Sequence, residues 1–263
     1  RAGGQVWRHG PHHLRAAALN ERLTALQAGS VVLWQGARVV APLDAQGLLV
    51  ESAEQGALML GYRKLILATG ARELLLPFDG WTLPGVTGAG GLQALIKGGV
   101  PVRGERIVIA GSGPLLLAAL ATARQAGAQV VAVVEQAPRP AVARFGVSLA
   151  ATPAKLWQAV QLTRGLAGLR YWTGSVVREA LGNGRVERVR IQRGANDAND
   201  VVLACERIAC GYGLVPNIVL AQALGGAGGA AGPQSSLGLA GADGGDVIGG
   251  TALFTLLLVI PLP

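Results

Sequence analysis

The spacing of apolar and polar positions predicts a helix followed by several strands in the first part of the chain. Residues 11–26 repeat apolar side chains at helical spacing, which predicts a helix. Between residues 30 and 63, short apolar stretches separated by glycine and proline predict strands. The continuous apolar run KLILATG, residues 64–70, predicts a strand buried on both faces.

A second pattern begins after a proline-containing stretch at residues 80–104, where we expect a domain boundary or a crossover. Residues 105–110 and 129–135 predict strands, and residues 114–126 between them predict a helix that follows a glycine turn. This order is typical of a right-handed βαβ unit in a parallel sheet. The expected fold class is therefore α/β, with a Rossmann-like parallel sheet covered by helices.

The segment after this unit predicts one more helix and an antiparallel hairpin. Residues 140–168 have helical spacing, and YWTGSVVREALGNGRVERVRIQRG predicts a hairpin that turns at residues 182–184. In that hairpin Val189 and Ile191 alternate with Arg188, Arg190 and Gln192. This alternation predicts one buried face and one solvent-exposed face. The run VVLACERIACGYG predicts a strand that returns to the sheet. The glycine-rich segment beyond Leu224 shows neither helical nor strand periodicity.

Composition and charge exclude several classes of function. The net charge of +8 comes from scattered arginines, and only 4% of residues are aromatic, which argues against nucleic-acid binding. The closing apolar run is shorter than the roughly 20 residues of a membrane span, and no signal peptide opens the chain. Two cysteines and three histidines without ligand spacing indicate no metal site and fit a reducing cytoplasm.

The turn Gly111-Ser112-Gly113-Pro114 carries the strongest chemical signal. Gly111 allows a tight turn after an apolar strand, and Gly113 lets the backbone approach a pyrophosphate at the start of the next helix. Leu116 stands where the G-x-G-x-x-G pattern has its third glycine, a position that packs helix against strand. The turn is therefore either a nucleotide-binding turn or a structural bend that binds nothing.

Glu135 ends the strand that follows this helix, where an acidic side chain accepts hydrogen bonds from a ribose 2′-hydroxyl. An acid at this position favours NAD or another adenine nucleotide over NADP. A second signal is Ala68-Thr69-Gly70, because small residues at a strand end permit close contact between backbone and cofactor.

Taken in order, the segments GGQ, LILATGARELLLPFDGWTLPGV, VIAGSGPLLLA and IACGYGLVPN resemble flavoproteins with two dinucleotide-binding domains, the pyridine nucleotide-disulfide oxidoreductase superfamily. Within it the chain is most similar to the A or alpha subunits of opine oxidases, hydrogen cyanide synthase and related amine dehydrogenases. The resemblance covers residues 1–224. It implies two interleaved dinucleotide-binding domains: a partial FAD-binding domain at 1–103, an NAD(P)-binding-like Rossmann domain at 104–215, and a return to the FAD domain with a glycine-rich tail at 216–263.

The resemblance also implies which residues hold cofactors. The positions that match the family's FAD contacts are Gly3, Gly4, Gln5, Ala68, Thr69 and Gly70. The positions that match the family's contacts with a second nucleotide, here NAD or another adenine nucleotide, are Gly111, Ser112, Gly113, Pro114 and Glu135. Gly211, Tyr212 and Gly213 match the segment where the chain returns from the second domain to the first.

Three departures from the family shape the functional hypothesis. The chain starts after the family's opening glycine-rich βαβ turn, so the first domain is incomplete. Residues 225–263 match neither the family's closing strand nor its cysteine-rich segment, and no Cys-x-x-Cys pair is present. The one Cys-x4-Cys spacing, Cys205 to Cys210, lies in the run VVLACERIACGYG, outside the segments matched to FAD. The hypothesis is therefore an oxidoreductase subunit that passes electrons from an amine, opine or amino-acid-like substrate and works with a catalytic partner subunit. No catalytic acid, base or nucleophile stands out, and the alternatives are a nucleotide-binding module without turnover and an inactive remnant.

Overall fold

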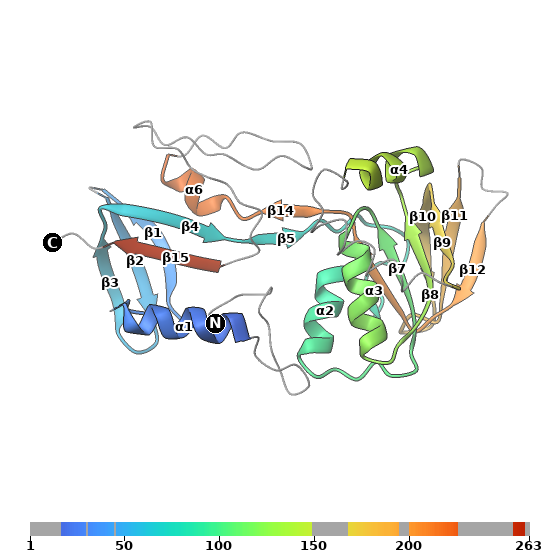
Figure 1. Ribbon diagram of the computed structural model, residues 1–263, viewed down its shortest axis with the longest axis horizontal. Helices are drawn as coiled ribbons and strands as arrows, with labels where there is room; N and C mark the ends of the chain where they lie inside the picture. Colours follow the sequence, from blue (N-terminus) through green and yellow to red (C-terminus); the bar gives the residue numbers. More distant parts are fainter. Residues whose placement is uncertain are drawn as a thin grey trace. The chain divides into compact units, whose positions relative to one another are not determined.

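We describe the fold from a computed structural model of the chain (Figure 1). The structure describes residues 17–29, 31–44, 46–148, 168–194, 200–225 and the backbone of 255–260. Gly3, Gly4 and Gln5, most of the helix expected at 140–168, and the glycine-rich stretch beyond residue 225 lie outside the described residues.

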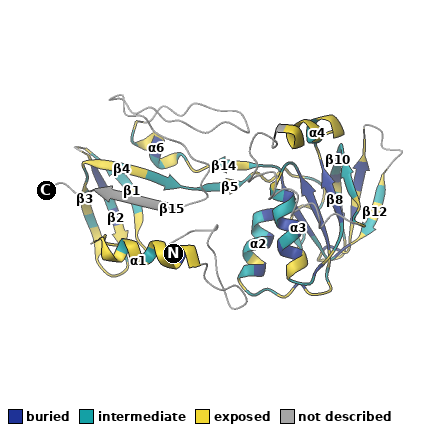
Figure 2. Ribbon diagram, in the orientation of Figure 1, coloured by how far each residue is buried: buried dark blue, intermediate teal, exposed yellow. Residues whose placement is uncertain are grey.

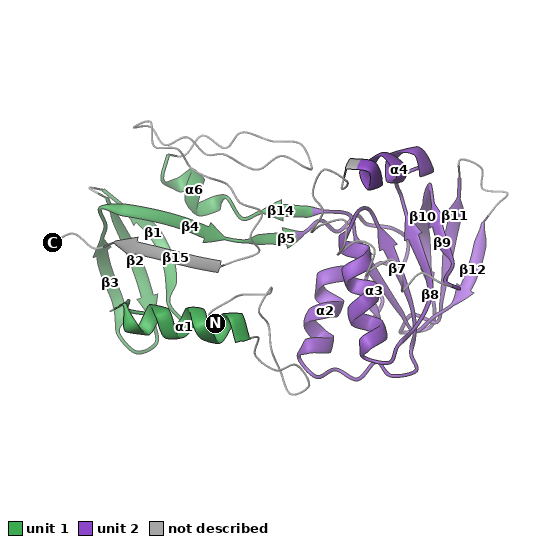
Figure 3. Ribbon diagram, viewed as in Figure 1, with its two compact units in different colours: residues 1–72, 214–263 green, residues 73–213 purple. Residues whose placement is uncertain are grey.

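The chain forms two compact units (Figure 3), one of which is discontinuous in sequence. Unit 1 consists of residues 1–72 and 214–263, and unit 2 consists of residues 73–213. The chain passes between them through β5 (Ala71–Glu73) and β14 (Leu214–Pro216), which pair with each other. The units are therefore interleaved along the sequence.

The division between the units lies at residue 73, upstream of the domain boundary expected near residue 104. Hydrogen bonds within unit 2 explain the difference. β6 (Val86–Gly88) pairs in parallel with β13 (Arg207–Gly211). The carboxylate of Glu73 accepts the amide hydrogens of Gly90 and Gly91 at 2.6 and 2.9 Å, which caps the start of α2 (Ala89–Lys97).

A five-stranded sheet with the order β6-β13-β7-β8-β9 forms the centre of unit 2. Its pairings are parallel, and β7 (Arg106–Gly111) is joined to β8 (Gln129–Glu135) through helix α3 (Leu115–Gln125). The short strand β9 (Tyr171–Thr173) follows β8 at the edge of the sheet. The expected Rossmann-like parallel sheet and its βαβ unit are confirmed.

Each face of this sheet is covered by a different layer, as the buried strands in Figure 2 indicate. On β7, Ile107 and Ile109 pack in a cluster with α2 and α3, including Leu92 and Leu120. Val108 and Ala110 alternate with them, so the two-residue period of the strand turns them toward a second cluster. That cluster contains the antiparallel sheet of β10 (Ser175–Leu181), β11 (Arg188–Arg193) and β12 (Val201–Ala204).

The antiparallel sheet confirms the expected hairpin and corrects two details. Val189 and Ile191 face the core as expected, but Gln192 is only 5% exposed, and its side-chain oxygen accepts a hydrogen bond from Arg178 Nε, which satisfies that buried atom. The run VVLACERIACGYG is not one strand. The backbone changes partner after Cys205, whose amide donates to Glu187, so that β12 ends in the antiparallel sheet and β13 starts in the parallel one.

Unit 1 contains an antiparallel three-stranded sheet of β1 (Arg38–Leu43), β2 (Gly47–Ser52) and β3 (Gly56–Gly61). Among the described residues of this unit the helices are α1 (Ala17–Ala28) and α6 (Val219–Ala223). Helix α4 (Arg139–Ser148) belongs to unit 2. Across the described ranges, helices are either too short or too polar to traverse a bilayer.

The strand expected to be buried on both faces is only partly covered, so that expectation is wrong. β4 (Lys64–Thr69) pairs with the antiparallel strand β15 (Thr255–Ile260) in a two-stranded sheet, and Ile66 remains 53% exposed. A two-stranded ribbon cannot enclose both of its own faces, whatever its apolar content.

Two crossed ion pairs fasten the amino ends of β7 and β13. Arg106 pairs with Glu206, and Arg207 pairs with Glu105, so each strand contributes one acid and one base. The main-chain amide of Arg106 also donates to Glu206, at 2.6 Å. The hydrogen bonds from Arg106 hold the pKa of Glu206 below its ordinary value.

We predict that Glu206→Gln lowers the free energy of unfolding at neutral pH and flattens its dependence on acid. The folded-state pKa of Glu206 is depressed, so its contribution is present above the unfolded pKa and is lost as pH falls through the folded pKa. Urea unfolding at pH 7, 5 and 3.5 measures this. Glu187→Gln is the control, because Glu187 is exposed and forms no ion pair among the described side chains. Equal pH profiles for the two variants would contradict the prediction.

Candidate functional site

The turn after β7 is held against β13 by direct backbone contact. Gly111 has φ of +145°, and a Cβ atom placed on it would lie 2.0 Å from the carbonyl oxygen of Gly211. The amide of Ser112 donates to that same oxygen at 2.8 Å. Gly111 is therefore required by the close approach of two strands, a reason that the tight turn expected from the sequence did not include.

The second glycine borders open space. Gly113 has φ of +87°, and a Cβ atom there would meet no heavy atom within 4 Å. The amides of Leu116 and Leu117 turn back to the carbonyls of Gly113 and Pro114, at 3.2 and 3.1 Å. Leu116 is fully buried in the cluster with α2 and α3, which confirms its packing role in place of the third glycine. The geometry fits an anion placed above Gly113 at the positive end of α3.

Glu135 lies at the end of β8 beside this turn, and only 2% of it is exposed. Its Oε2 atom accepts the amide hydrogen of Gly113 at 3.1 Å, and its Oε1 atom accepts that of Ala137 at 3.0 Å. The hydroxyl of Tyr171, from β9, donates to Oε2 at 3.4 Å. Burial, followed by the charge of Glu135, raises the pKa of Tyr171 to about 12, so this hydroxyl is protonated at neutral pH.

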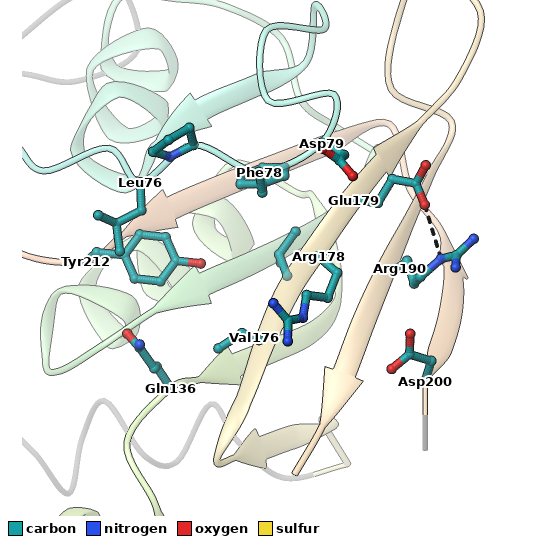
Figure 4. Close-up of a pocket in the computed structure, with 12 residues that line it drawn as sticks. Leu76, Phe78, Asp79, Gln136, Val176, Arg178, Glu179, Arg190, Asp200 and Tyr212 are labelled. Atoms are coloured by element: carbon teal, nitrogen blue, oxygen red, sulfur yellow. Dashed lines mark ion pairs between the residues drawn. The ribbon is translucent and has the colours of Figure 1, made fainter. Parts of the chain in front are cut away.

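A polar groove of about 580 Å³ opens in unit 2 beside the turn (Figure 4). Gln136 and Tyr212, which directly follow β8 and β13, contribute to it together with Arg178 from β10. Its far side holds the ion pair between Arg190 and Glu179, at 3.1 Å. Burial raises the pKa of Tyr212 well above its ordinary value. In α/β sheets ligands bind outside the carboxyl ends of strands, where this groove begins.

The segment expected to contact FAD lies in unit 1, at the end of β4. The Thr69 hydroxyl donates to the Asn217 carbonyl at 2.5 Å, and the Asn217 side-chain amide donates to the Thr69 carbonyl at 3.0 Å. The amide of Asn217 also donates to Gly70, at 2.9 Å, where φ is +69°. Asn217 therefore fixes the backbone of the Ala68–Gly70 segment.

Sequence reasoning missed Tyr171, Asn217 and the groove. Asn217 lies in the run IACGYGLVPN, which the sequence analysis matched to the family. The sequence did not indicate its contact with Thr69, which is 148 residues away. Tyr171 begins a three-residue strand, and no local pattern points from it to Glu135.

Cysteine and metal chemistry have no support in the described part of the chain. Cys205 and Cys210 are free and buried, and burial raises the pKa of each thiol to about 12. A thiol with so high a pKa is a weak nucleophile at neutral pH. Among the described residues, no three His, Cys, Asp or Glu side chains are grouped as metal ligands.

Comparison with known proteins assigns the family. The family described as pyridine nucleotide-disulphide oxidoreductase matches residues 5–232. The chain belongs to this family. Its members are oxidoreductases that depend on FAD and nicotinamide nucleotides, so the family assignment agrees with a Rossmann-type sheet and a glycine turn at its carboxyl edge.

Relatives in the family include subunits of larger enzymes. The chain is 34% identical to hydrogen cyanide synthase subunit HcnB of Pseudomonas aeruginosa over 246 residues, which cover 86% of this chain and 52% of that protein. It is 33% identical to HcnB of Pseudomonas protegens, over 72% of this chain and 42% of that protein. The A subunit of opine oxidase from Rhizobium meliloti is 42% identical over 80 residues, 30% of this chain and 18% of that protein. The chain thus spans about half the length of the HcnB proteins that it matches.

Solved structures of the family share the fold. Thioredoxin reductase of T. acidophilum superposes with a TM-score of 0.57 at 17% identity, over 84% of this chain and 68% of that one. A ferredoxin reductase from Rhodopseudomonas palustris superposes with a TM-score of 0.55 at 24% identity, over 78% of this chain and 47% of that one.

We predict that Gly111→Ala destabilises the protein by more than about 4 kcal/mol, because the new methyl group meets backbone that cannot move without separating β7 from β13. Gly104→Ala is the matched control. Gly104 also has positive φ, at +78°, but nothing lies within 4 Å of its added Cβ, so only backbone strain of roughly 1–3 kcal/mol is expected. Denaturant unfolding measures both, and equal losses would show that the contact with Gly211 is unimportant.

Proposed function

We propose that the chain is the nucleotide- and flavin-binding part of an oxidoreductase subunit. In this proposal it passes electrons from the oxidation of an amine, opine or amino-acid-like substrate. The observation that carries the proposal is the turn at residues 111–113, where one glycine permits strand contact and the next borders open space at the start of α3. Similarity to HcnB and to the opine oxidase relative supports the substrate class.

The nucleotide proposed for unit 2 is NAD or another adenine nucleotide. Its pyrophosphate is proposed to lie above Gly113, with the Ser112 hydroxyl and the amide of Leu115, the first residue of α3, as its donors. Glu135 accepts a hydrogen bond from the ribose of this nucleotide. It disfavours a ribose 2′-phosphate, because the carboxylate and the phosphate are both anionic and repel each other. Gln136 and Tyr212, which follow Glu135 and Gly211 in the chain, line the groove.

FAD is proposed for unit 1, with Thr69 and Gly70 beside it and Asn217 holding their backbone. FAD supplies the redox chemistry when it is bound, and the protein supplies position and electrostatics. Gly3, Gly4 and Gln5 are proposed for the same cofactor.

A catalytic partner subunit completes the proposed enzyme. HcnB and the opine oxidase relative are each named as one subunit of an enzyme, which supports a partner here. The proposed compartment is the cytoplasm, supported by two free cysteines that form no disulfide.

A second candidate is a nucleotide-binding module that acts without flavin. The observation that favours it is the location of both buried clusters, whose members all come from unit 2. A self-contained core of this kind supports nucleotide binding by unit 2 whatever unit 1 binds.

We predict that the chain binds ADP and NAD, and that Gly113→Ala weakens both by roughly tenfold or more, because the methyl group enters the space in front of the turn. Calorimetric titration measures the affinities. Gly184→Ala is the control: its φ of +75° imposes similar strain, and its position in the hairpin turn is remote from α3 in sequence. Equal effects of the two substitutions would remove Gly113 from the site.

We predict that the purified chain, loaded with excess FAD and then desalted, retains flavin absorbance. Asn217→Ala should lower the retained fraction, because it frees the carbonyl of Thr69 from the side-chain amide that holds it. Asn183→Ala, in the hairpin turn, is the control. A colourless wild-type protein that still binds ADP would favour the nucleotide-binding module over the flavin subunit.

A further inference from the structure

Glu135 is unusual in how much of its hydrogen-bonding capacity the protein itself uses. A carboxylate offers about four lone-pair positions to donors. Oε2 receives the amide of Gly113 and the hydroxyl of Tyr171, and Oε1 receives the amide of Ala137. Counted over donors in the described residues, one position is left, and it belongs to Oε1.

A ribose carries two adjacent hydroxyl groups, and a carboxylate with one position free on each oxygen can accept both. Here the two oxygens are not equivalent, because Oε2 already has two protein donors. The near-complete burial of the side chain restricts its rotation, so the oxygens cannot exchange places without breaking the bonds to the turn.

We infer that Glu135 accepts one ribose hydroxyl only, through Oε1, and that Tyr171 occupies the position a second hydroxyl would take. Tyr171 is thus a specificity-determining and positioning residue for an adenine nucleotide recognised through a single ribose hydroxyl. This inference rests on the proposed binding of such a nucleotide at the turn.

Tyr171 is the one of the three donors that can be removed without removing the turn. The amides of Gly113 and Ala137 are backbone groups of the turn and of the segment after β8, and every residue other than proline supplies them. Tyr171 instead contributes a side chain from the neighbouring strand. Its backbone is placed by parallel pairing with Val133 and by the bond from the Val133 amide to Arg170 at 2.8 Å.

The protonation of Tyr171 sets the direction of its bond. Because its pKa is raised to about 12, the hydroxyl is a donor throughout the physiological range and Glu135 is the acceptor. The bond is long, at 3.4 Å, so the phenol is a weaker donor than a ribose hydroxyl at normal distance. Removing it should therefore expose Oε2 to a better partner.

The test uses the full chain and three ligands: ADP, 2′-deoxy-ADP and 3′-deoxy-ADP. In the wild type, one deoxy nucleotide should bind as tightly as ADP and the other roughly tenfold or more weakly, since one hydrogen bond to a charged group is lost. In Tyr171→Phe, both deoxy nucleotides should bind more weakly than ADP, because the second hydroxyl now reaches Oε2. Tyr62→Phe, which removes a hydroxyl in unit 1, should leave the wild-type ratios unchanged.

The outcomes separate this inference from the function on which it rests. If ADP binds and both deoxy nucleotides are weakened equally in the wild type, Glu135 accepts both hydroxyls and the inference is wrong. If Tyr171→Phe keeps the wild-type ratios, Tyr171 has no part in the discrimination. If no nucleotide binds the wild type, the proposed function itself fails. The comparison of ADP with the two deoxy nucleotides in the wild-type protein requires no variant. It therefore still tests the inference if Tyr171→Phe fails to fold.

Discussion

The candidate nucleotide site depends on the contact between two glycines where β7 and β13 end. At Gly111 a side chain would meet the carbonyl of Gly211, and at Gly211 a side chain would lie 3.0 Å from Cβ of Ala89. Because neither position carries a side chain, the strands come close enough for the Ser112 amide to bond across them. The start of α3, the turn and the position of Gly113 all follow from that approach.

The same sheet explains why the turn is held rigidly. Alternate residues of β7 face two different apolar layers, one of helices and one of antiparallel strands. Crossed ion pairs join β7 to β13 at their amino ends, and the glycine contact joins them at their carboxyl ends. A turn supported at both ends of its strand presents a fixed geometry to a ligand, which lowers the ordering cost of binding.

Glu135 connects stability with recognition. A buried carboxylate needs donors, and the protein supplies them from the turn, from the segment after β8 and from Tyr171. In the proposed site, the donors that satisfy this buried carboxylate also limit the hydrogen-bonding positions left for a ligand. The chain belongs to the pyridine nucleotide-disulphide oxidoreductase family, and in the proposed nucleotide site the arrangement around this carboxylate limits which ribose contacts a ligand can make.

By itself the sequence determined the βαβ unit, the hairpin and the glycine turn, because these depend on local periodicity and on residues with special backbone freedom. It also placed Leu116 and Glu135 correctly at the ends of their elements. Only the tertiary structure decided that residues 73–103 join unit 2, that Gln192 is buried, that β4 stays half-exposed and that Tyr171 meets Glu135. Each of these depends on contacts between segments far apart in the chain, and periodicity within one segment carries no information about the partner it will meet.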